Sequence, residues 1–375
     1  MHTPQSALDT LEPIVQSVIA PSAASVDQAG EFPSAGLAAL GSAGLLGLTV
    51  ATEHGGMGLG LDAAALVVER LARACASTAM VVCMHYSGTA VLNAHAGPQV
   101  LRDVADGKHL STLAFSEAGS RSHFWAPMSS ATLDTGSVVL DAQKSFVTAA
   151  RHATAYVWSS RPVGAEGIST LWLVPRNAAG LNVPTPFDGM GLRGNDSSPV
   201  SAHDVRVHPS AMLGPDGKGF DLMMGVVLPT FNVLNAAASI GLCEAAVAAT
   251  AAHASATRHE EAGNSLAELP TIRANIARMR SKTDMARTLW LDTVAAIGSG
   301  RADGMMRVLQ VKAVAGETAI EVTTLAMRVC GGAAYRKEVG VERYFRDGQA
   351  ASVMGPTTDV LYDFIGKAAC GLPLF

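Results

Sequence analysis

An arginine and a glycine pair near the C-terminus are suited to holding a charged ligand. Arg328 is followed by Val-Cys and then by Gly331 and Gly332. A helix that ends in a glycine pair frees backbone N–H groups in a crowded place, and a guanidinium favours phosphate. The simpler alternative is an ordinary helix cap beside a surface cation. The pattern alone favours this simpler alternative.

The composition limits which functions these residues can serve. The chain has 375 residues, of which 49% are hydrophobic and 16% charged, and its formal net charge is −5. This length allows a sizeable core, arranged as two or three domains or as one large unit. The charge balance gives no electrostatic case for binding nucleic acid or an anionic membrane. Neither a secretory signal nor an uninterrupted apolar run of about 18 residues is visible, so we expect a cytoplasmic enzyme.

The cysteines do not form a recognisable metal-binding or disulfide pattern. There are five, at wide spacings: Cys75, Cys83, Cys243, Cys330 and Cys370. No pair has the spacing of metal ligands, so we expect reduced core residues and no metal site.

Three consecutive parts of the chain differ in their patterns. Residues 1–112 are predicted to be helical, because apolar residues recur at spacings of three and four. Residues 113–214 contain short β-type runs, including a hairpin with its turn at Asp134-Thr135-Gly136. Residues 215–375 are predicted to form long helices, with a kink or break at Pro229. The expected class is α+β, with an N-terminal helical domain, a small antiparallel β domain and a C-terminal four-helix bundle.

This order of domains resembles the acyl-CoA dehydrogenase flavoprotein family, and the likeness runs from Phe32 to Ile365. Residues 41–58, which include His54-Gly55-Gly56, are similar to the first signature of the family. Residues 190–196 and 204–207 are similar to its β-domain signature. The resemblance implies an FAD-dependent oxidoreductase that acts on the CH–CH group of an acyl thioester.

The resemblance also implies which residues bind FAD. Phe115 and Ser116 correspond to the strand and loop that line the flavin ring, and Phe146 to the aromatic that covers it. Without the resemblance, Phe146 would be taken for a core residue of a strand. Arg258 and Arg328 correspond to positions at the adenosine-diphosphate end of a neighbouring subunit's FAD, which implies a homo-dimer or tetramer. The full set is Phe115, Ser116, Ser122, Phe146, Thr148, Arg258, Arg328, Gly331, Gly332, Thr357 and Asp359.

The expected catalytic base is missing. In the family, a glutamate in a Glu-Gly-Thr turn removes the substrate α-proton, and the corresponding residue here is Gly355. A second position that carries the glutamate in some relatives corresponds to Phe231. An arginine that helps to hold coenzyme A is replaced by Asn232. The resemblance therefore places Ser122, Asn232 and Gly355 at the substrate and leaves the catalytic residue unknown.

Several other side chains could serve as the base. The candidates are His85, Tyr86, His123 and Asp359. Among them His123 is the most interesting, because histidine titrates near neutrality and His123 adjoins Ser122. The alternative for each is a satisfied polar group or a solvated side chain.

Three functions stay open at this point. The first is an acyl thioester dehydrogenase with a relocated base, acting with an electron-transfer flavoprotein. The second is a flavin-dependent monooxygenase on the same fold, which needs a flavin reductase but no base for the α-proton. The third is a non-catalytic FAD-binding subunit of a hetero-oligomer.

Overall fold

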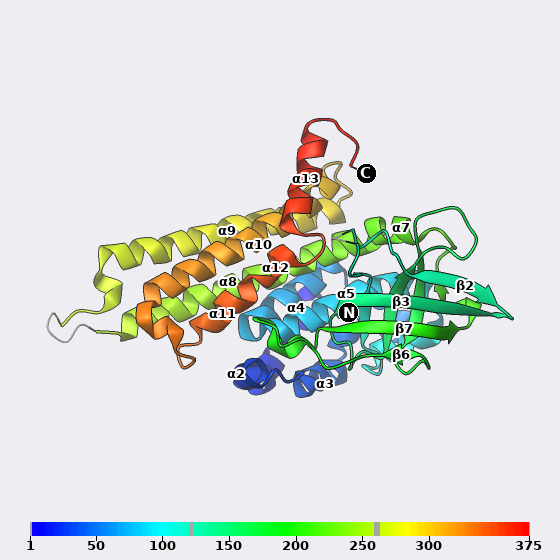
Figure 1. The fold of residues 1–375 in the computed structure, drawn as a ribbon. Helices are drawn as coiled ribbons and strands as arrows, with labels where there is room; N and C mark the ends of the chain where they lie inside the picture. Colours follow the sequence, from blue (N-terminus) through cyan, green and yellow to red (C-terminus); the bar gives the residue numbers. More distant parts are fainter. Residues whose placement is uncertain (1, 121–122, 259–262, 375) are drawn as a thin grey trace. The chain divides into compact units, whose positions relative to one another are not determined.

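The computed structural model describes residues 2–120, 123–258 and 263–374 (Figure 1). The chain forms two compact units. Unit 1 contains Met1–Val67, Met80–Asp188 and Arg193–Phe231, and unit 2 contains Val68–Ala79, Gly189–Leu192 and Asn232–Phe375. Helices α4 (Leu61–Ala74), α5 (Ala76–His95) and α8 (Leu228–Ala256) contribute residues to both. The domain boundaries expected near residues 112 and 214 stay a prediction.

Unit 1 begins with short helices. They are α1 (Pro4–Ile14), a π-helical segment (Val15–Ile19), α2 (Ala20–Ala29), α3 (Ser34–Ser42) and α6 (Pro98–Ala105). Helix α3 ends at Ser42, before the apolar residues Leu45 and Leu46. Gly44 is left-handed there, with φ 73°, and a 3₁₀ turn follows at Leu45–Gly47. Glycine adopts this conformation at no steric cost, which explains the early end of α3.

Two four-stranded sheets form the rest of unit 1. Their strands are β1 (Ser111–Ala114), β2 (Ser130–Asp134), β3 (Ser137–Val147), β4 (Ala155–Ser160), β5 (Thr170–Pro175), β6 (Leu181–Asn182), β7 (Ser198–Val207) and β8 (Met212–Leu213). One sheet has the order β1-β4-β5-β8 and the other β2-β3-β7-β6. Their facing side chains share one core that includes Trp158, Trp172 and Leu140. Packing two sheets face to face buries the apolar side of each.

The predicted hairpin is confirmed, while one detail of the sheets differs from the expectation. Strands β2 and β3 pair as neighbours, and the turn residues Thr135 and Gly136 both have positive φ, at 42° and 85°. Two such residues are typical of the type I′ turn, whose twist matches that of the strands. The β domain was expected to be antiparallel, yet β1 and β4 run parallel, with Ser111 opposite Ala155.

Unit 2 is a helical bundle. It contains most of α8, together with α9 (Pro270–Gly298), α10 (Gly304–Cys330), α11 (Val341–Gly348), α12 (Ala350–Val353) and α13 (Thr358–Ala369). In Figure 1 the long helices α8, α9 and α10 run along one another. Buried residues from these three helices, such as Cys243, Met279 and Val322, meet in one core. The predicted α+β class with a C-terminal bundle is confirmed.

A break in regular α-helix precedes Pro229, as the sequence predicts. Helix α7 (Gly219–Leu222) leads into a π-helical segment, Met223–Val227, and α8 begins at Leu228. Proline has no N–H to donate, so one helical hydrogen bond is lost there. In the π-helical segment beside it, the backbone hydrogen bonds span five residues instead of four. The helical run Gly219–Ala256 is long and apolar enough to cross a membrane. However, 83% of its most apolar stretch is buried, as in the core helix of a globular protein.

The structure bears out most of the expectation for the cysteines. All five are reduced cysteines outside any disulfide, and four are buried. Cys370 is exposed, which corrects its assignment to the core, because it lies at the end of α13 rather than within a packed face.

Candidate functional site

The side chain expected to cover the flavin points away from the core of the two sheets. Along β3, Lys144 pairs with Val200 and Val147 with Ser198, so β3 holds one residue more than β7 between the two pairs. This is a β-bulge, which reverses the alternation of side chains beyond it. Regular alternation would bury Phe146 with Ala142 and Lys144, but its exposed fraction is 66%. Phe146 therefore faces outward and can cover a planar ligand.

Two further residues frame this outward face of unit 1. The ring of Phe187 lies 4.7 Å from that of Phe146, at a tilt of 37°. Thr148, two residues beyond Phe146, is almost buried, and its carbonyl accepts a hydrogen bond of 2.8 Å from Thr112 Oγ1. The pair of aromatics gives this end of β3 an exposed apolar surface, which suits an isoalloxazine better than solvent.

The loop after β1 lies beside the same part of β3. The Ser145 N–H donates to the carbonyl of Ser116 over 2.9 Å. Phe115 is buried and stacks on Phe124, with 6.3 Å between ring centroids, so its side chain serves the core. A contribution of Phe115 to a cofactor site would come from its backbone. Ser122 lies outside the described residues.

Two of the proposed bases have no free proton acceptor. His85 is fully buried; its Nε2 lies 2.9 Å from the Leu46 carbonyl, and its Nδ1 accepts from the Ser111 N–H over 3.0 Å. Burial lowers the pKa of His85 to about 4. Tyr86 donates to the Leu45 carbonyl over 2.6 Å, and burial raises its pKa. These contacts assign both side chains to structural roles.

His123 differs from these two residues. Its side chain is exposed, and the ring packs edge-on against Trp125 with 5.0 Å between centroids. Nδ1 lies 3.1 Å from the carbonyl of Ser120, and Nε2 makes no hydrogen bond within the described residues. Of the three aromatic candidates, His123 is the one with a nitrogen available to a substrate.

In unit 2, the turn that contains Gly355 is held by a buried lysine. Lys312, on α10, is fully buried, and its Nζ donates to the carbonyls of Ala351, Met354 and Pro356 over 2.9, 3.0 and 2.8 Å. Gly355 is half-buried, and its φ lies outside the left-handed region, so other residues can adopt its conformation. The turn is therefore well ordered although its glycine has no proton acceptor.

The other residues predicted near the substrate or the flavin in unit 2 differ in how exposed their side chains are. Thr357 is the N-cap residue of α13, and Asp359 is exposed in the first turn of that helix, where its charge suits the helix dipole. Asn232 is fully buried, and its Nδ2 donates to the Val308 carbonyl over 3.1 Å. Asn232 is therefore closed to a thioester in this conformation.

The predicted diphosphate-binding residues lie on the surface of unit 2. Arg258 and Arg328 are exposed, and neither makes an ion pair within the described residues. Gly331 ends α10 with φ 54°, and a Cβ at Gly331 or Gly332 would meet no atom of the described chain within 4 Å. Arg258 Nη1 donates to the Gly263 carbonyl over 3.3 Å. Exposed guanidinium groups and open backbone fit a diphosphate, which needs both charge and close approach.

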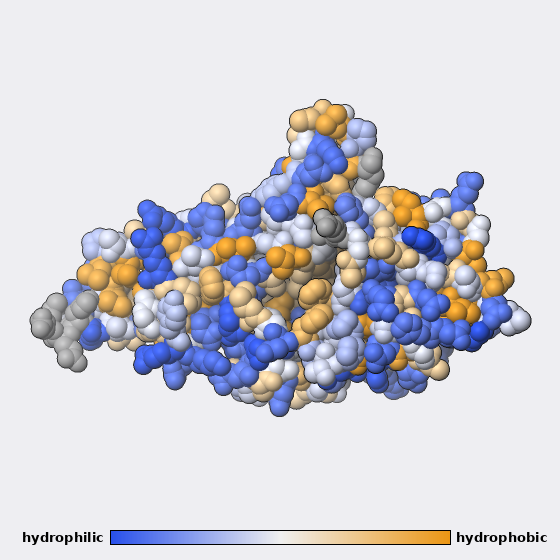
Figure 2. All heavy atoms as spheres, in the orientation of Figure 1, coloured by the Kyte–Doolittle hydropathy of each residue, from blue (hydrophilic) through white to orange (hydrophobic). Residues whose placement is uncertain are grey.

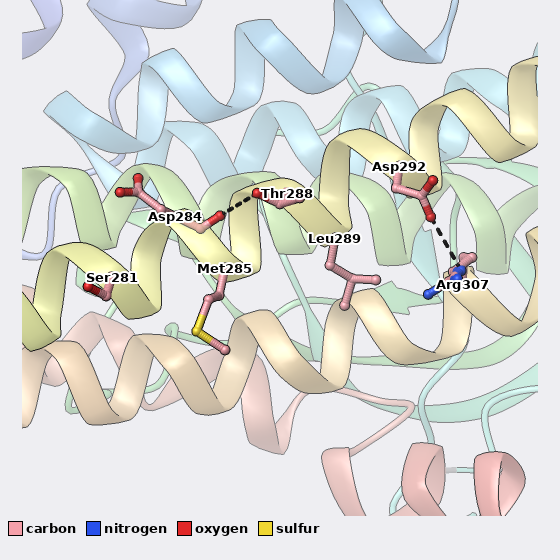
Figure 3. A pocket seen from close by; sticks show the side chains of 7 residues that line it. All are labelled: Ser281, Asp284, Met285, Thr288, Leu289, Asp292 and Arg307. Carbon is pink, nitrogen blue, oxygen red and sulfur yellow. Dashed lines mark hydrogen bonds and ion pairs between the residues drawn. The ribbon is translucent and has the colours of Figure 1, made fainter.

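A shallow depression on the bundle contains none of the predicted residues. It encloses about 790 Å³ on α9 and α10 and is lined by Ser281, Asp284, Met285, Thr288, Leu289, Asp292 and Arg307 (Figure 3). Arg307 and Asp292 form an ion pair across one end, over 3.3 Å. In Figure 2 the visible hydrophobic atoms of the bundle form separate groups among hydrophilic ones. The described residues include no group of three or more metal-ligating side chains.

Three structural residues of the site were not found from the sequence. Phe187 lies in an irregular segment whose sequence has no helical or strand periodicity, so its contact with Phe146 could not be predicted. Lys312 is an isolated cation in a largely apolar stretch, whereas Lys144 follows Gln143 and precedes Ser145. Lys144 alone carried a usable signal, because it occupies the buried phase of an alternating strand.

Comparison with known proteins identifies the family. The acyl-CoA dehydrogenase N-terminal, middle and C-terminal domain models match residues 3–103, 112–205 and 217–370 respectively. The chain belongs to the acyl-CoA dehydrogenase family. It is an FAD-dependent oxidoreductase of this type, and the outward Phe146 and the open glycine pair fit that cofactor.

Similar acyl-CoA dehydrogenases span nearly the whole chain. The probable acyl-CoA dehydrogenase YngJ of Bacillus subtilis is 27% identical over 370 residues, covering 95% of each chain. The short-chain specific mitochondrial enzyme of Bos taurus is 28% identical, covering 96% of this chain and 88% of its own. The structure of butyryl-CoA dehydrogenase from Megasphaera elsdenii has a TM-score of 0.91 at 23% identity, covering 98% of both chains.

Proposed function

We propose that this acyl-CoA dehydrogenase family member oxidises the CH–CH group of an acyl thioester, carried by coenzyme A or by an acyl carrier. The outward-facing side chain of Phe146 carries the proposal, because an aromatic that is 66% exposed contributes little to the packed core. Family membership over three consecutive domain matches supports it. FAD supplies the acceptor for the hydride when it is bound.

The residues of this chain then divide the work of binding. Phe146 covers one face of the flavin and excludes water from it, while Thr148 and the backbone at Ser116 lie at its edge. Preorganised donors at that edge stabilise the charge that develops on reduction. Arg258 and Arg328 hold diphosphate oxygens, with Gly331 and Gly332 allowing close approach. Because such residues serve a neighbour's cofactor in the family, we expect a homo-oligomer.

We assign the proton acceptor to His123. Gly355 has no acceptor, and the contacts of His85 and Tyr86 occupy their polar atoms. The imidazole of His123 is exposed, and its Nδ1 lies 3.1 Å from the Ser120 carbonyl, so Nε2 remains for a substrate proton. Replacing His123 by Ala should lower the rate of thioester oxidation by about 10²-fold or more. His208, an exposed histidine of the same unit, provides a matched control.

Anaerobic mixing of the FAD-loaded protein with a panel of acyl thioesters tests the function. The panel should include straight-chain, branched and cyclic acyl groups, on both coenzyme A and an acyl carrier protein. We expect at least one member to abolish the absorbance of the oxidised flavin, with an enoyl thioester formed in equal amount. If dithionite reduces the flavin but no thioester does, the proposal is wrong.

A flavin-dependent monooxygenase is the second candidate, and the glycine at position 355 favours it. Such a reaction needs no base for the α-proton, so the loss of the carboxylate would not slow it. The two candidates differ in their partners. A dehydrogenase passes electrons to an electron-transfer flavoprotein, whereas a monooxygenase consumes oxygen after reduction by a flavin reductase. Oxygen uptake that depends on a reductase and a thioester would favour the second candidate.

A further inference from the structure

A buried ion pair lies directly behind the proposed flavin-binding face of unit 1. Lys144 Nζ lies 2.6 Å from Glu117 Oε1, and the exposed fractions of the two residues are 2% and 7%. Replacing a buried ion pair by apolar side chains often leaves stability unchanged or improved, so stability alone does not account for it. A buried pair can instead serve to fix one geometry.

The pair joins three segments of the chain at a single point. Glu117 Oε2 accepts from the backbone N–H groups of Met128 and Ser129 over 2.7 and 3.0 Å, and Oε1 also accepts from Ser129 Oγ over 2.6 Å. Lys144 Nζ also donates to the carbonyl and Oγ of Ser159, over 2.7 and 3.0 Å. The pair therefore fixes the loop after β1 to strands β3 and β4.

The bulge in β3 begins immediately after Lys144. Lys144 is the last residue in register before the extra residue, and it also forms a backbone bridge with Glu117. The next N–H along the strand, that of Ser145, donates to the Ser116 carbonyl. The anchored lysine thus determines where regular pairing stops, and Phe146 turns outward two residues later.

We propose that Glu117 and Lys144 are positioning residues that fix this bulge and so hold Phe146 toward the flavin. The inference rests on the proposed function, which places the flavin on that face. Both groups are charged at neutral pH: burial lowers the pKa of Lys144 to about 8, against the opposing effect of Glu117. Burial raises the pKa of Glu117, but Lys144 and the hydrogen bonds outweigh it and lower the pKa overall.

A double-mutant cycle on FAD affinity tests the proposal. The variants are Lys144→Met, Glu117→Gln, Phe146→Ala and the combination of Lys144→Met with Phe146→Ala, each loaded with FAD. The readouts are the dissociation constant for FAD and the visible circular dichroism of the bound flavin. We expect Lys144→Met, Glu117→Gln and Phe146→Ala each to weaken FAD binding at least ten-fold and to change the dichroism in the same way. The control is Asp134→Asn, which removes an exposed ion pair with Arg206 in the same sheet and should change affinity less than two-fold.

The combination decides between positioning and general destabilisation. If Lys144 acts through Phe146, adding Lys144→Met to Phe146→Ala weakens FAD binding little further, because the effects of coupled residues do not add. Full additivity, or wild-type affinity and dichroism in either single variant of the pair, would overturn the proposal. Should Lys144→Met fail to fold, Glu117→Gln combined with Phe146→Ala gives the same test, because glutamine has a similar size but can accept hydrogen bonds at only one of the two oxygen positions.

The outcomes separate this inference from the proposed function. FAD affinity and dichroism need no turnover, so coupling between Lys144 and Phe146 can be observed even if no thioester reduces the flavin. Conversely, a wild-type protein that oxidises thioesters while Phe146→Ala binds FAD normally would support the function and overturn the positioning role.

Discussion

The buried ammonium of Lys312 lies 2.8 Å from the carbonyl oxygen of Pro356 and 3.0 Å from that of Met354. These carbonyls belong to the residues on either side of Gly355. A single cation thus holds both flanks of the position that carries the base in the family. Any side chain placed at 355 would start from a fixed backbone, which is the condition for a preorganised catalytic group.

A carboxylate at this turn should replace the base that His123→Ala removes. In a His123→Ala background, we expect Gly355→Glu to speed anaerobic flavin reduction by an acyl thioester by about 10²-fold or more, within the range of about 10²–10⁴ that a general base contributes. Gly355→Gln is the matched control, since it has the same size without the basicity. Equal rates for the two variants, measured in single-turnover stopped-flow experiments, would show that the turn does not direct position 355 toward the substrate.

Removing the cation that holds the turn should weaken unit 2. In Lys312→Met three buried carbonyls lose a charged donor, so we expect a loss of about 2–4 kcal/mol in the free energy of unfolding. Urea denaturation measures this loss. The control is Lys282→Met, which removes an exposed pair with Glu321 in the same bundle and should cost less than about 1 kcal/mol. Similar losses for the two variants would contradict a structural role specific to Lys312.

The buried imidazole of His85 should make stability depend on pH. Burial lowers its pKa to about 4, below the ordinary value of about 6.5 that it regains on unfolding. The unfolded chain therefore binds a proton first, and stability falls as pH drops from about 6.5 to about 4. The loss between pH 7.5 and pH 5 should be on the order of 2 kcal/mol.

A substitution distinguishes the contribution of His85 to the pH dependence from that of His109. Burial also lowers the pKa of His109 to about 4, so the total loss includes a contribution from both groups. In His85→Gln we expect the loss between pH 7.5 and pH 5, measured by urea denaturation, to shrink by about half. An unchanged loss would assign the pH dependence to other groups.

The exposed arginines should matter for the cofactor rather than for folding. We expect Arg258→Ala and Arg328→Ala each to raise the dissociation constant for FAD by about ten-fold, the effect of losing one charge-assisted hydrogen bond. The effect should shrink at high salt, because exposed charges are screened. Arg278→Ala, on the exposed side of α9, should leave FAD binding unchanged. FAD affinity that responds equally to all three substitutions would indicate a general effect of charge.

The sequence predicts the elements of this protein better than the directions of its side chains. The hairpin at Thr135 and Gly136 was predictable because its turn is local, and so was the break before Pro229. The outward turn of Phe146 was not, because it depends on one unpaired residue in a ladder with a distant strand. The roles of Lys144 and Lys312 depend on carbonyl and carboxylate partners at least 15 residues away. No local pattern shows such partners.

The bulge in β3 makes the length of this strand as important as its composition. Deleting Ser145 would leave one residue between Lys144 and Val147, as β7 has between their partners, and Phe146 would still point outward in regular alternation. The aromatic would then lie one residue closer to the buried lysine. A one-codon change in length is thus a simple evolutionary route by which this fold can shift an aromatic lid along its strand, and substitution patterns alone would not reveal it.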